Sequence, residues 1–162
     1  QYIDGRVSGS ASYFCLGGKI MLNAVNVAQQ DVNSGANVLF ANTRYSSRRC
    51  TCNYGWLNHV EGSGLFTLTN RSNCPMTVEV EFNGNVSANA TGATALAVEL
   101  NGEAIGGTEM DYTVVTANTF QNVGATTVVT VPSGGSLIVS IGNVGTAAAI
   151  VKDANIIIKR IS

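Results

Sequence analysis

Hydrophobic and polar residues alternate with a period of two along most of the chain from residue 64 to residue 161. The segment 76–82 is the clearest case, because its alternate residues are apolar: Met76, Val78, Val80 and Phe82. The same pattern returns in four later segments, at 96–100, 126–131, 137–141 and 156–161. A β-strand sends successive side chains to opposite faces, so this alternation predicts a sheet with one buried face.

The strands that this pattern predicts are short and closely spaced. We expect them at about 37–42, 54–60, 64–70, 76–86, 94–101, 110–116, 120–131, 136–142 and 150–161. Residues that favour tight turns separate them, including Asn83-Gly84, Asn101-Gly102 and the Pro-Ser-Gly-Gly run that begins at Pro132. No helical pattern lies between them, which excludes a parallel βαβ architecture. The predicted fold class is therefore all-β, an antiparallel sandwich or barrel.

The chain divides into two unequal parts. Residues 1–35 contain small polar residues, a cysteine and a Gly-Gly pair, and within them only residues 19–25 look like a strand. Residues 36–162 carry the regular alternation. At 162 residues the chain is long enough for one domain with a terminal segment. We therefore expect an N-terminal extended arm over 1–35 and a single sandwich domain over 36–162.

The composition favours a protein that works outside the cytosol or within an assembly. Hydrophobic residues make up 45% of the chain, enough for a core, but charged residues only 12%, about half the usual share. The net charge of −1 gives no electrostatic attraction for nucleic acid or anionic lipid, so we expect neither as a partner. A polar surface with few charges is more typical of extracellular proteins, virion proteins and oligomer subunits than of monomeric cytosolic enzymes.

Two further features concern membranes and secretion. No stretch reaches the ~18 apolar residues that a membrane-spanning helix needs. The N-terminal residues lack the charged head and apolar core of a signal peptide. The alternatives that the chain never had a leader, or that a leader has been removed, both stay open.

The cysteines and the single histidine are the first candidates for chemistry. Cys50 and Cys52 precede His59, but this is not a recurrent zinc spacing, and a fourth ligand would have to be Cys74 or Cys15. A disulfide of Cys74 with Cys50 or Cys52 is the alternative, and free buried thiols are the third. Because a disulfide needs a specific distance and direction between the two Cβ atoms, we expect at most one of Cys50 and Cys52 to reach Cys74 readily. We favour a disulfide over free thiols, and free thiols over a metal site; four cysteines permit three complete pairings, and the sequence does not choose among these.

Catalysis finds little support in the sequence. His59 is the only histidine, so a Ser-His-Asp triad or a Cys-His pair would have to be built around it. The outward positions of the predicted strands are mostly Thr, Ser, Asn and isolated charges. No Asp-x-Asp-x-Asp-Gly calcium loop occurs, although calcium held by several loops stays open. We therefore predict that the protein is not an enzyme and uses no cofactor.

Basic and aromatic residues gather in the segment 44–59. Its candidate contact residues are Arg44, Tyr45, Arg48, Arg49, Tyr54, Trp56 and His59. One interpretation is the edge of the core packed under a loop. The other is a contact surface for a subunit, a capsid or a glycan, because amphipathic aromatic side chains favour such interfaces. The Arg48-Arg49 pair is too short a cluster to predict a nucleic-acid site.

The order of motifs in residues 36–162 resembles a known group of jelly-roll domains. The motifs are Gly-Ser-Gly-Leu-Phe-Thr-Leu at 62–68, Val-Glu-Val-Glu-Phe-Asn-Gly-Asn at 78–85, Leu-Asn-Gly at 100–102, Val-Pro-Ser-Gly-Gly-Ser-Leu at 131–137 and Ala-Asn-Ile-Ile-Ile at 154–158. The group is the tumour-necrosis-factor and complement-globular-head type, in the versions found in phage structural proteins of Gram-positive gut bacteria and in spore-surface collagen-like glycoproteins. The opening residues 2–15 also resemble the phage-encoded versions. The chain lacks the collagen-like Gly-X-Y stalk of the spore proteins.

The resemblance implies a homotrimer of antiparallel jelly-roll sandwiches with a structural or surface-binding role. We expect a virion structural protein that decorates a phage head, or forms a fibre on it, and lies at the virion surface. The arm would bind capsid proteins, and the residues proposed for this anchoring are Tyr2, Ile3, Arg6, Tyr13 and Phe14. The alternatives are a module that recognises a host-surface glycan or protein, and a subunit of a bacterial cell or spore surface.

Overall fold

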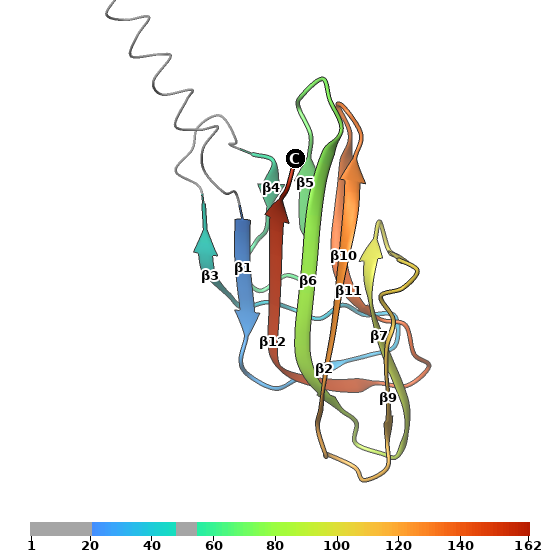
Figure 1. Cartoon of the computed structure of the whole chain (residues 1–162). Coiled ribbons are helices and arrows are strands. Elements are labelled where there is room, and N and C mark those ends of the chain that lie inside the picture. Colours follow the sequence, from blue (N-terminus) through green and yellow to red (C-terminus); the bar gives the residue numbers. More distant parts are fainter. Residues whose placement is uncertain (1–20, 48–54) are drawn as a thin grey trace, which may run out of the picture.

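The protein, represented by a computed structural model, is described over residues 21–47 and 55–162 (Figure 1). These residues form twelve strands: β1 (Met21–Asn26), β2 (Gln30–Val32), β3 (Asn42–Ser46), β4 (Leu57–Asn58), β5 (Phe66–Thr69), β6 (Met76–Ser87), β7 (Gly92–Leu100), β8 (Glu103–Ala104), β9 (Met110–Val114), β10 (Gln121–Val131), β11 (Ser136–Asn143) and β12 (Ala149–Arg160). In the described part of the chain, no helix is long and apolar enough to span a membrane.

The strands build two sheets that pack face to face. The first has the order β10-β6-β12-β1-β3, and β2 also pairs with β12. The second has the order β4-β5-β11-β7-β8, and β9 also pairs with β7. Every strand pairing is antiparallel. The predicted all-β antiparallel sandwich is therefore confirmed.

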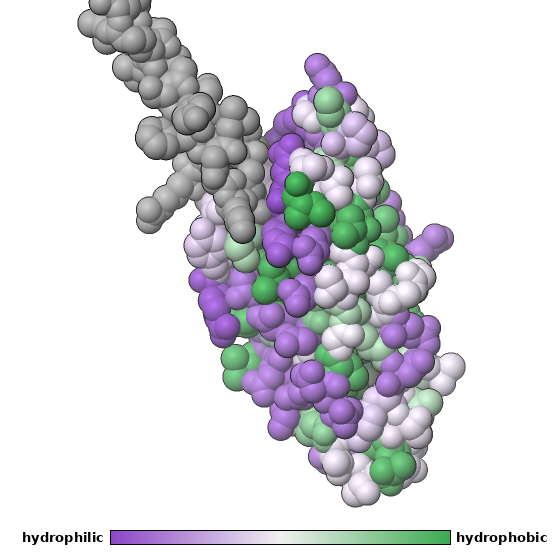
Figure 2. All heavy atoms as spheres, viewed as in Figure 1, coloured by the Kyte–Doolittle hydropathy of each residue, from purple (hydrophilic) through white to green (hydrophobic). Residues whose placement is uncertain are grey.

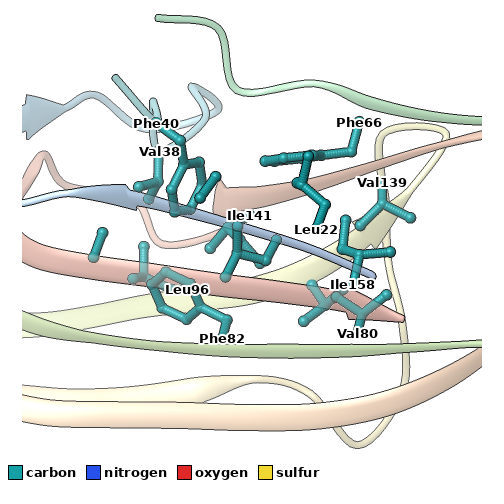
Figure 3. Close-up of a cluster of buried hydrophobic side chains, with 14 of the residues drawn as sticks. Leu22, Val38, Phe40, Phe66, Val80, Phe82, Leu96, Val139, Ile141 and Ile158 are labelled. Carbon is teal, nitrogen blue, oxygen red and sulfur yellow. The ribbon is translucent and has the colours of Figure 1, made fainter. Parts of the chain in front are cut away.

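The core lies between the two sheets and follows from the alternation in the sequence. Val80 and Phe82 of β6 pair in register with Ile158 and Ile156 of β12, so that four apolar side chains point to the same face. Figure 3 shows how side chains from both sheets meet in this layer. The ring of Phe40 sits edge-on to its aromatic neighbours, 5.5 Å from Phe66 and 6.3 Å from Phe82 between ring centroids. Edge-to-face contacts of this kind stabilise aromatic cores.

Residues 37–42 differ from the strand that the alternation predicts. Val38 and Phe40 are fully buried, as expected, but they lie in a connection, and the next strand, β3, begins only at Asn42. A single bridge joins Asn37 to Gly142 of β11. The two apolar side chains fill the space between the sheets without a continuous ladder of hydrogen bonds. Burial alone therefore produces the alternation here.

The sheet already includes residues that the sequence assigned to the arm. Strand β1 pairs with β12 on one side and with β3 on the other, and β2 pairs with β12. Leu22 and Ala24 of β1 face the core and are buried. The boundary expected after residue 35 thus falls inside the sandwich, because the arm segment supplies apolar side chains that the first sheet needs. The five anchoring candidates, Tyr2, Ile3, Arg6, Tyr13 and Phe14, lie outside the described residues.

Candidate functional site

The exposed members of the predicted contact loop lie on β3. Arg44 and Tyr45 are both exposed, with 52% of Tyr45 accessible to solvent. Tyr45 pairs with Asn23 of β1, an outward-facing position of the first sheet. Three other candidates, Arg48, Arg49 and Tyr54, lie outside the described residues. Within the described part, Arg44 and Tyr45 are therefore the members of the loop that offer a contact surface.

The remaining two candidates are interior residues. Trp56 and His59 are each only 7% exposed. The imidazole of His59 stacks on the ring of Phe66, with centroids 4.0 Å apart and planes 10° from parallel. Its Nδ1 lies 2.9 Å from the carbonyl oxygen of Leu65, so Nδ1 carries the proton and donates it. This burial fits the interpretation of a core edge under a loop, and it differs from the contact role predicted for these two residues.

The surroundings of Nε2 decide whether His59 could act as a general base. Its Nε2 is buried and has no hydrogen-bond partner among the described residues. A general base must lie within hydrogen-bond reach of the proton that it removes. No described hydroxyl or thiol lies at that distance from Nε2. The stacked imidazole packs in the described structure as an aromatic core residue.

Cys74 lies in the connection between β5 and β6, is exposed, and forms no disulfide with another described residue. Its candidate partners, Cys50 and Cys52, lie outside the described residues, so their disulfide stays a prediction. The connection itself is held by the buried amide of Asn70, whose Nδ2 donates to the carbonyl oxygens of Cys74 at 2.7 Å and Val131 at 3.0 Å. Its Oδ1 accepts from the backbone and the hydroxyl of Ser72. Every polar group of this side chain is thus satisfied.

Two carboxyl groups have raised pKa values, for different reasons. Burial raises the pKa of Glu99 on β7, and a hydrogen bond from the Ser140 hydroxyl partly offsets this. A hydrogen bond and the like charge of Asp111 raise the pKa of exposed Glu109. Among the described residues, no three His, Cys, Asp or Glu side chains are grouped closely enough to hold a metal ion.

One surface depression, which we call the end hollow, lies between the loops at one end of the sandwich. It has a volume of about 540 Å³ and is lined mainly by small residues of the β6–β7 and β11–β12 loops, together with Asp31 and Asn33. Asp31 is its single charged lining residue. The polar members of this lining are Asp31, Asn33, Asn89, Thr91, Thr94 and Thr146.

A second depression, the bulge hollow, lies where β12 is interrupted. Its volume is about 330 Å³, and its lining residues are Val25, Val27, Arg44, Asn83, Asp153, Ala154 and Asn155. The register of β12 against β6 shifts between Lys152 and Asn155, so two residues of β12 stand opposite Gly84 alone. Such a bulge redirects side chains locally. Sequence reasoning missed Asn83, Asp153 and Asn155 as candidates.

The glycine opposite the bulge permits the close approach of the strands. A Cβ at Gly84 would lie 3.0 Å from Cζ of Phe82 and 3.6 Å from Cα of Ala154. The bulge also left a trace in the sequence that could have revealed it. Buried residues of β12 fall on Val151 and then on Ala154, which breaks the period of two. A phase slip within an alternating segment is the expected signature of an inserted residue.

Strand β10 forms a long free edge of the first sheet. It has eleven residues, none of them charged, and within the described residues it pairs with a strand on one side only. Its outward-facing Val128 is 54% exposed. Its inward positions are buried at Val129 and Val131 but only half-buried at Val123, Ala125 and Thr127. The sandwich is thus incompletely covered along half of this edge.

Comparisons with known proteins show likeness in structure but not in sequence. No model of a known protein family matches the chain, and no curated protein matches it in sequence. Among solved structures, murine APRIL at pH 5.0 aligns with a TM-score of 0.61 at 9% identity, over 89% of this chain and 100% of that one. The chain has a jelly-roll fold of the TNF/C1q type.

Two further solved structures, one a TNF protein and one a complement globular domain, have a similar fold. The TNF protein Eiger from S. frugiperda has a TM-score of 0.61 at 6% identity and covers 89% of this chain and 93% of its own. The globular domain of zebrafish complement 1qA has a TM-score of 0.52 at 10% identity and covers 88% and 96%. At these identities the likeness establishes the fold alone. The resemblance stated from the sequence motifs is thereby confirmed at the level of the jelly roll.

Proposed function

We propose that this chain is a non-enzymatic structural protein that assembles into a homotrimer of jelly rolls and decorates the surface of a phage head. The observation that carries self-association is the free edge of β10. An exposed edge strand offers unpaired backbone N–H and C=O groups to any other chain, and monomeric proteins protect such strands with charges, prolines, bulges or short length. β10 has eleven residues and none of these devices.

The other edges of the two sheets are protected in the usual ways. β3 is five residues long and carries Arg44, and β4 has only two residues. β8 also has two residues and includes Glu103. β10 is therefore the edge that calls for a covering partner. Val123 and Ala125, which are half-buried residues of β10 itself, would become fully buried in the same contact.

A second copy of the chain is the partner that fits this edge. On the face of the molecule shown in Figure 2, hydrophilic and hydrophobic residues are intermixed, as expected for a surface with few charges. A contact between the β10 edge of one copy and a different surface of the next is heterologous, and a rotation that closes such contacts produces a ring. A trimer is the smallest such ring, and the jelly-roll resemblance favours it.

The placement on a virion rests on the sequence. The low charge of 12% and the likeness of the opening residues to phage-encoded jelly rolls support it. In this proposal residues 1–20 bind the capsid proteins, and residues 21–32 belong to the sandwich because they form β1 and β2. The jelly roll itself would then face solvent.

The assembly is tested by measuring its mass. Native mass spectrometry of the full chain should give three times the chain mass of 16.8 kDa. Thr127→Lys places an inward-pointing charge on the open half of β10, where the long side chain can still reach water. This variant should remain folded and shift to monomer, whereas Thr91→Lys in the exposed β6–β7 loop should remain trimeric. A monomeric wild-type chain would contradict the proposal.

The virion placement needs a separate experiment. Particles of the phage that encodes the chain should carry it in many copies, and chain lacking residues 1–20 should no longer bind them while its jelly roll stays folded. A deletion of all 35 arm residues would not serve, because it removes β1 and β2 from the first sheet. Absence from purified particles, or detection on the cell or spore envelope, would favour the bacterial-surface alternative.

A further inference from the structure

The bulge hollow combines a strained backbone with charged side chains that form no ion pair or hydrogen bond with another described residue. Asp153 has a positive φ of 50°, a conformation that residues other than glycine adopt rarely. Its backbone N–H donates to the carbonyl oxygen of Val27 at 3.2 Å, which holds the bulge against the end of β1. Backbone strain of this kind persists only where the surrounding structure imposes it, and it is frequent at binding sites.

The two charged groups that line the hollow are both uncommitted. Arg44 comes from β3 and Asp153 from β12, and neither side chain forms an ion pair or a hydrogen bond with another described residue. The charge pair on the same sheet behaves differently, since Lys159 and Glu79 meet at 3.4 Å. Arg44 and Asp153 thus border one depression, with opposite charges, without neutralising each other.

The rest of the lining supplies an apolar floor and amide groups. Val25 and Ala154 line the hollow although they are buried, so they form its floor. Asn155 accepts a hydrogen bond from Asn23 at 2.7 Å, which fixes its oxygen and leaves its amide nitrogen as a donor. Asn83 makes no side-chain hydrogen bond with another described residue. The hollow is thus an open, mainly polar depression with two buried residues at its base.

We propose that the bulge hollow binds a small zwitterionic group, with an anion and an ammonium on one compact unit, as in an α-amino acid. The guanidinium of Arg44 would hold the anion, and the carboxylate of Asp153 would hold the ammonium. The amide groups of Asn83 and Asn155 would orient the ligand. At about 330 Å³ the hollow has room for one such unit.

The charge balance of the lining selects a zwitterion over a singly charged ion. One positive and one negative side chain give the site no net charge. A ligand with a single charge would satisfy one of them and desolvate the other without compensation, which weakens binding. A zwitterion compensates both. A free amino acid and an amino-acid group on a host-surface polymer share this chemistry.

The site is tested by following backbone amide signals of the full chain in NMR titrations. Glycine, β-alanine and γ-aminobutyrate vary the spacing of the two charges, and sodium acetate and methylammonium chloride supply each charge alone. At least one zwitterion should bind with a dissociation constant on the order of 1 mM and shift signals around residues 25–27, 44, 83 and 153–155. Each single ion should bind at least about tenfold more weakly.

Two variants remove one charge each while preserving the backbone. Asp153→Asn keeps the bulge, because asparagine tolerates a positive φ. Arg44→Gln keeps a polar side chain on β3. Each should weaken zwitterion binding at least about tenfold. Glu81→Gln is the matched control, since Glu81 is an exposed carboxylate of β6 outside the lining, and it should bind like wild type.

Isolated cell walls of the host distinguish the two sources of the ligand. Wall binding that Asp153→Asn abolishes would assign the site to a surface polymer, and glycine-type binding without wall binding would assign it to a free amino acid. Acetate binding as tightly as any zwitterion, shifts confined to other residues, or unchanged affinity in both variants would overturn the proposal. So would loss of the trimer in Arg44→Gln, because the hollow would then receive a neighbouring copy. A monomeric wild type that still binds zwitterions would contradict the assembly alone.

Discussion

Strands β6 and β10 are neighbours in the first sheet and pair in unbroken register over eleven residues of β10, yet their inward faces differ. On β6 the inward side chains from Met76 to Phe82 are buried along the strand. On β10 burial is complete at Val129 and declines toward Val123. The difference arises because β6 has a strand on both sides and β10 on one.

This contrast separates two uses of the same strand sequence pattern. A β-strand with partners on both sides contributes mainly to the stability of the fold, since its apolar face leaves water completely. A strand at the edge keeps apolar surface and backbone hydrogen-bonding groups available for another chain. β6 therefore stabilises the monomer, whereas the open half of β10 is suited to assembly.

Phe82→Ala should have the largest effect on folding. The ring is 1% exposed and packs against Phe40, so its removal leaves a cavity in the centre of the sandwich. We expect the free energy of unfolding to fall by about 3–5 kcal/mol, measured by chemical denaturation. A loss below about 1 kcal/mol would show that this part of β6 is not the centre of the core.

Asn70→Ala should have the next largest effect. Its amide joins Val131, at the end of β10, to Cys74, just before β6 begins, and thereby fixes the covered end of the edge. The substitution leaves the buried carbonyl group of Val131 without this donor, so we expect a loss of about 1–3 kcal/mol in the free energy of unfolding. Asn70→Asp offers a comparison that keeps the acceptor and removes the donor, and it should restore little of this stability.

Val129→Ala and Val123→Ala compare the two halves of β10 directly. At buried Val129 the substitution removes two methyl groups from the core, and we expect a loss of roughly 1.5 kcal/mol. At half-buried Val123 the loss in the isolated chain should be about half as large. If the proposed trimer forms, the effect of Val123→Ala should increase at the concentrations where the chain is associated. Equal losses at both positions under all conditions would remove the distinction between the halves.

Glu99→Gln should have the smallest effect. Glu99 lies on β7 in the second sheet, outside the two strands that are compared above. Burial raises the pKa of Glu99 above its ordinary value of 4.5 in the folded protein. The group therefore binds its proton more tightly when folded, and stability is lost as pH rises through the folded pKa. Glutamine removes this loss, so the variant should be slightly more stable at neutral pH, by less than about 0.5 kcal/mol, because solvent screens the carboxylate.

The pH profile checks the sign of this prediction. Well below pH 4.5, where Glu99 is protonated in both states, wild type and Glu99→Gln should unfold at similar denaturant concentrations. Their curves should separate as pH rises above this value. A variant that is less stable than wild type at neutral pH would indicate that the Ser140 hydrogen bond outweighs the effect of burial.

The fold was largely predictable because alternation reports burial, but alternation does not report neighbours. The segments of β6, β10 and β12 were found from their apolar periodicity, whereas nothing in that periodicity shows that β10 lies at an edge. Val38 and Phe40 alternate like strand residues yet lie in a connection, because a buried side chain needs a core and not a ladder. The hydrogen-bond partners of the backbone are set by distant segments.

The candidate surfaces were less predictable than the fold. Arg44 and Tyr45 are exposed as a contact site requires, but Trp56 and His59 are interior, since an amphipathic ring serves equally well in a core and at an interface. The sequence gives no reason to predict Asp153 as a site residue, because an isolated acidic residue in a strand is ordinarily solvated. Asp153 becomes a candidate only together with Arg44, which lines the same depression. Arg44 is more than a hundred residues away in the chain, and the strand order β12-β1-β3 brings the two residues to one depression.

The position of β12 has a consequence for how the protein folds during synthesis. This strand, at 149–160, pairs with β1, β2 and β6, so it joins the parts of the first sheet that are made much earlier. β1 can pair with β3, and β6 with β10, at earlier stages, but a ribosome must complete nearly the whole sandwich sequence before β12 joins β1 to β6. Until then the apolar faces of β1 and β6 stay exposed, and folding dominated by such distant pairings is slow. Premature termination within β12 should yield chains that aggregate instead of shorter folded domains.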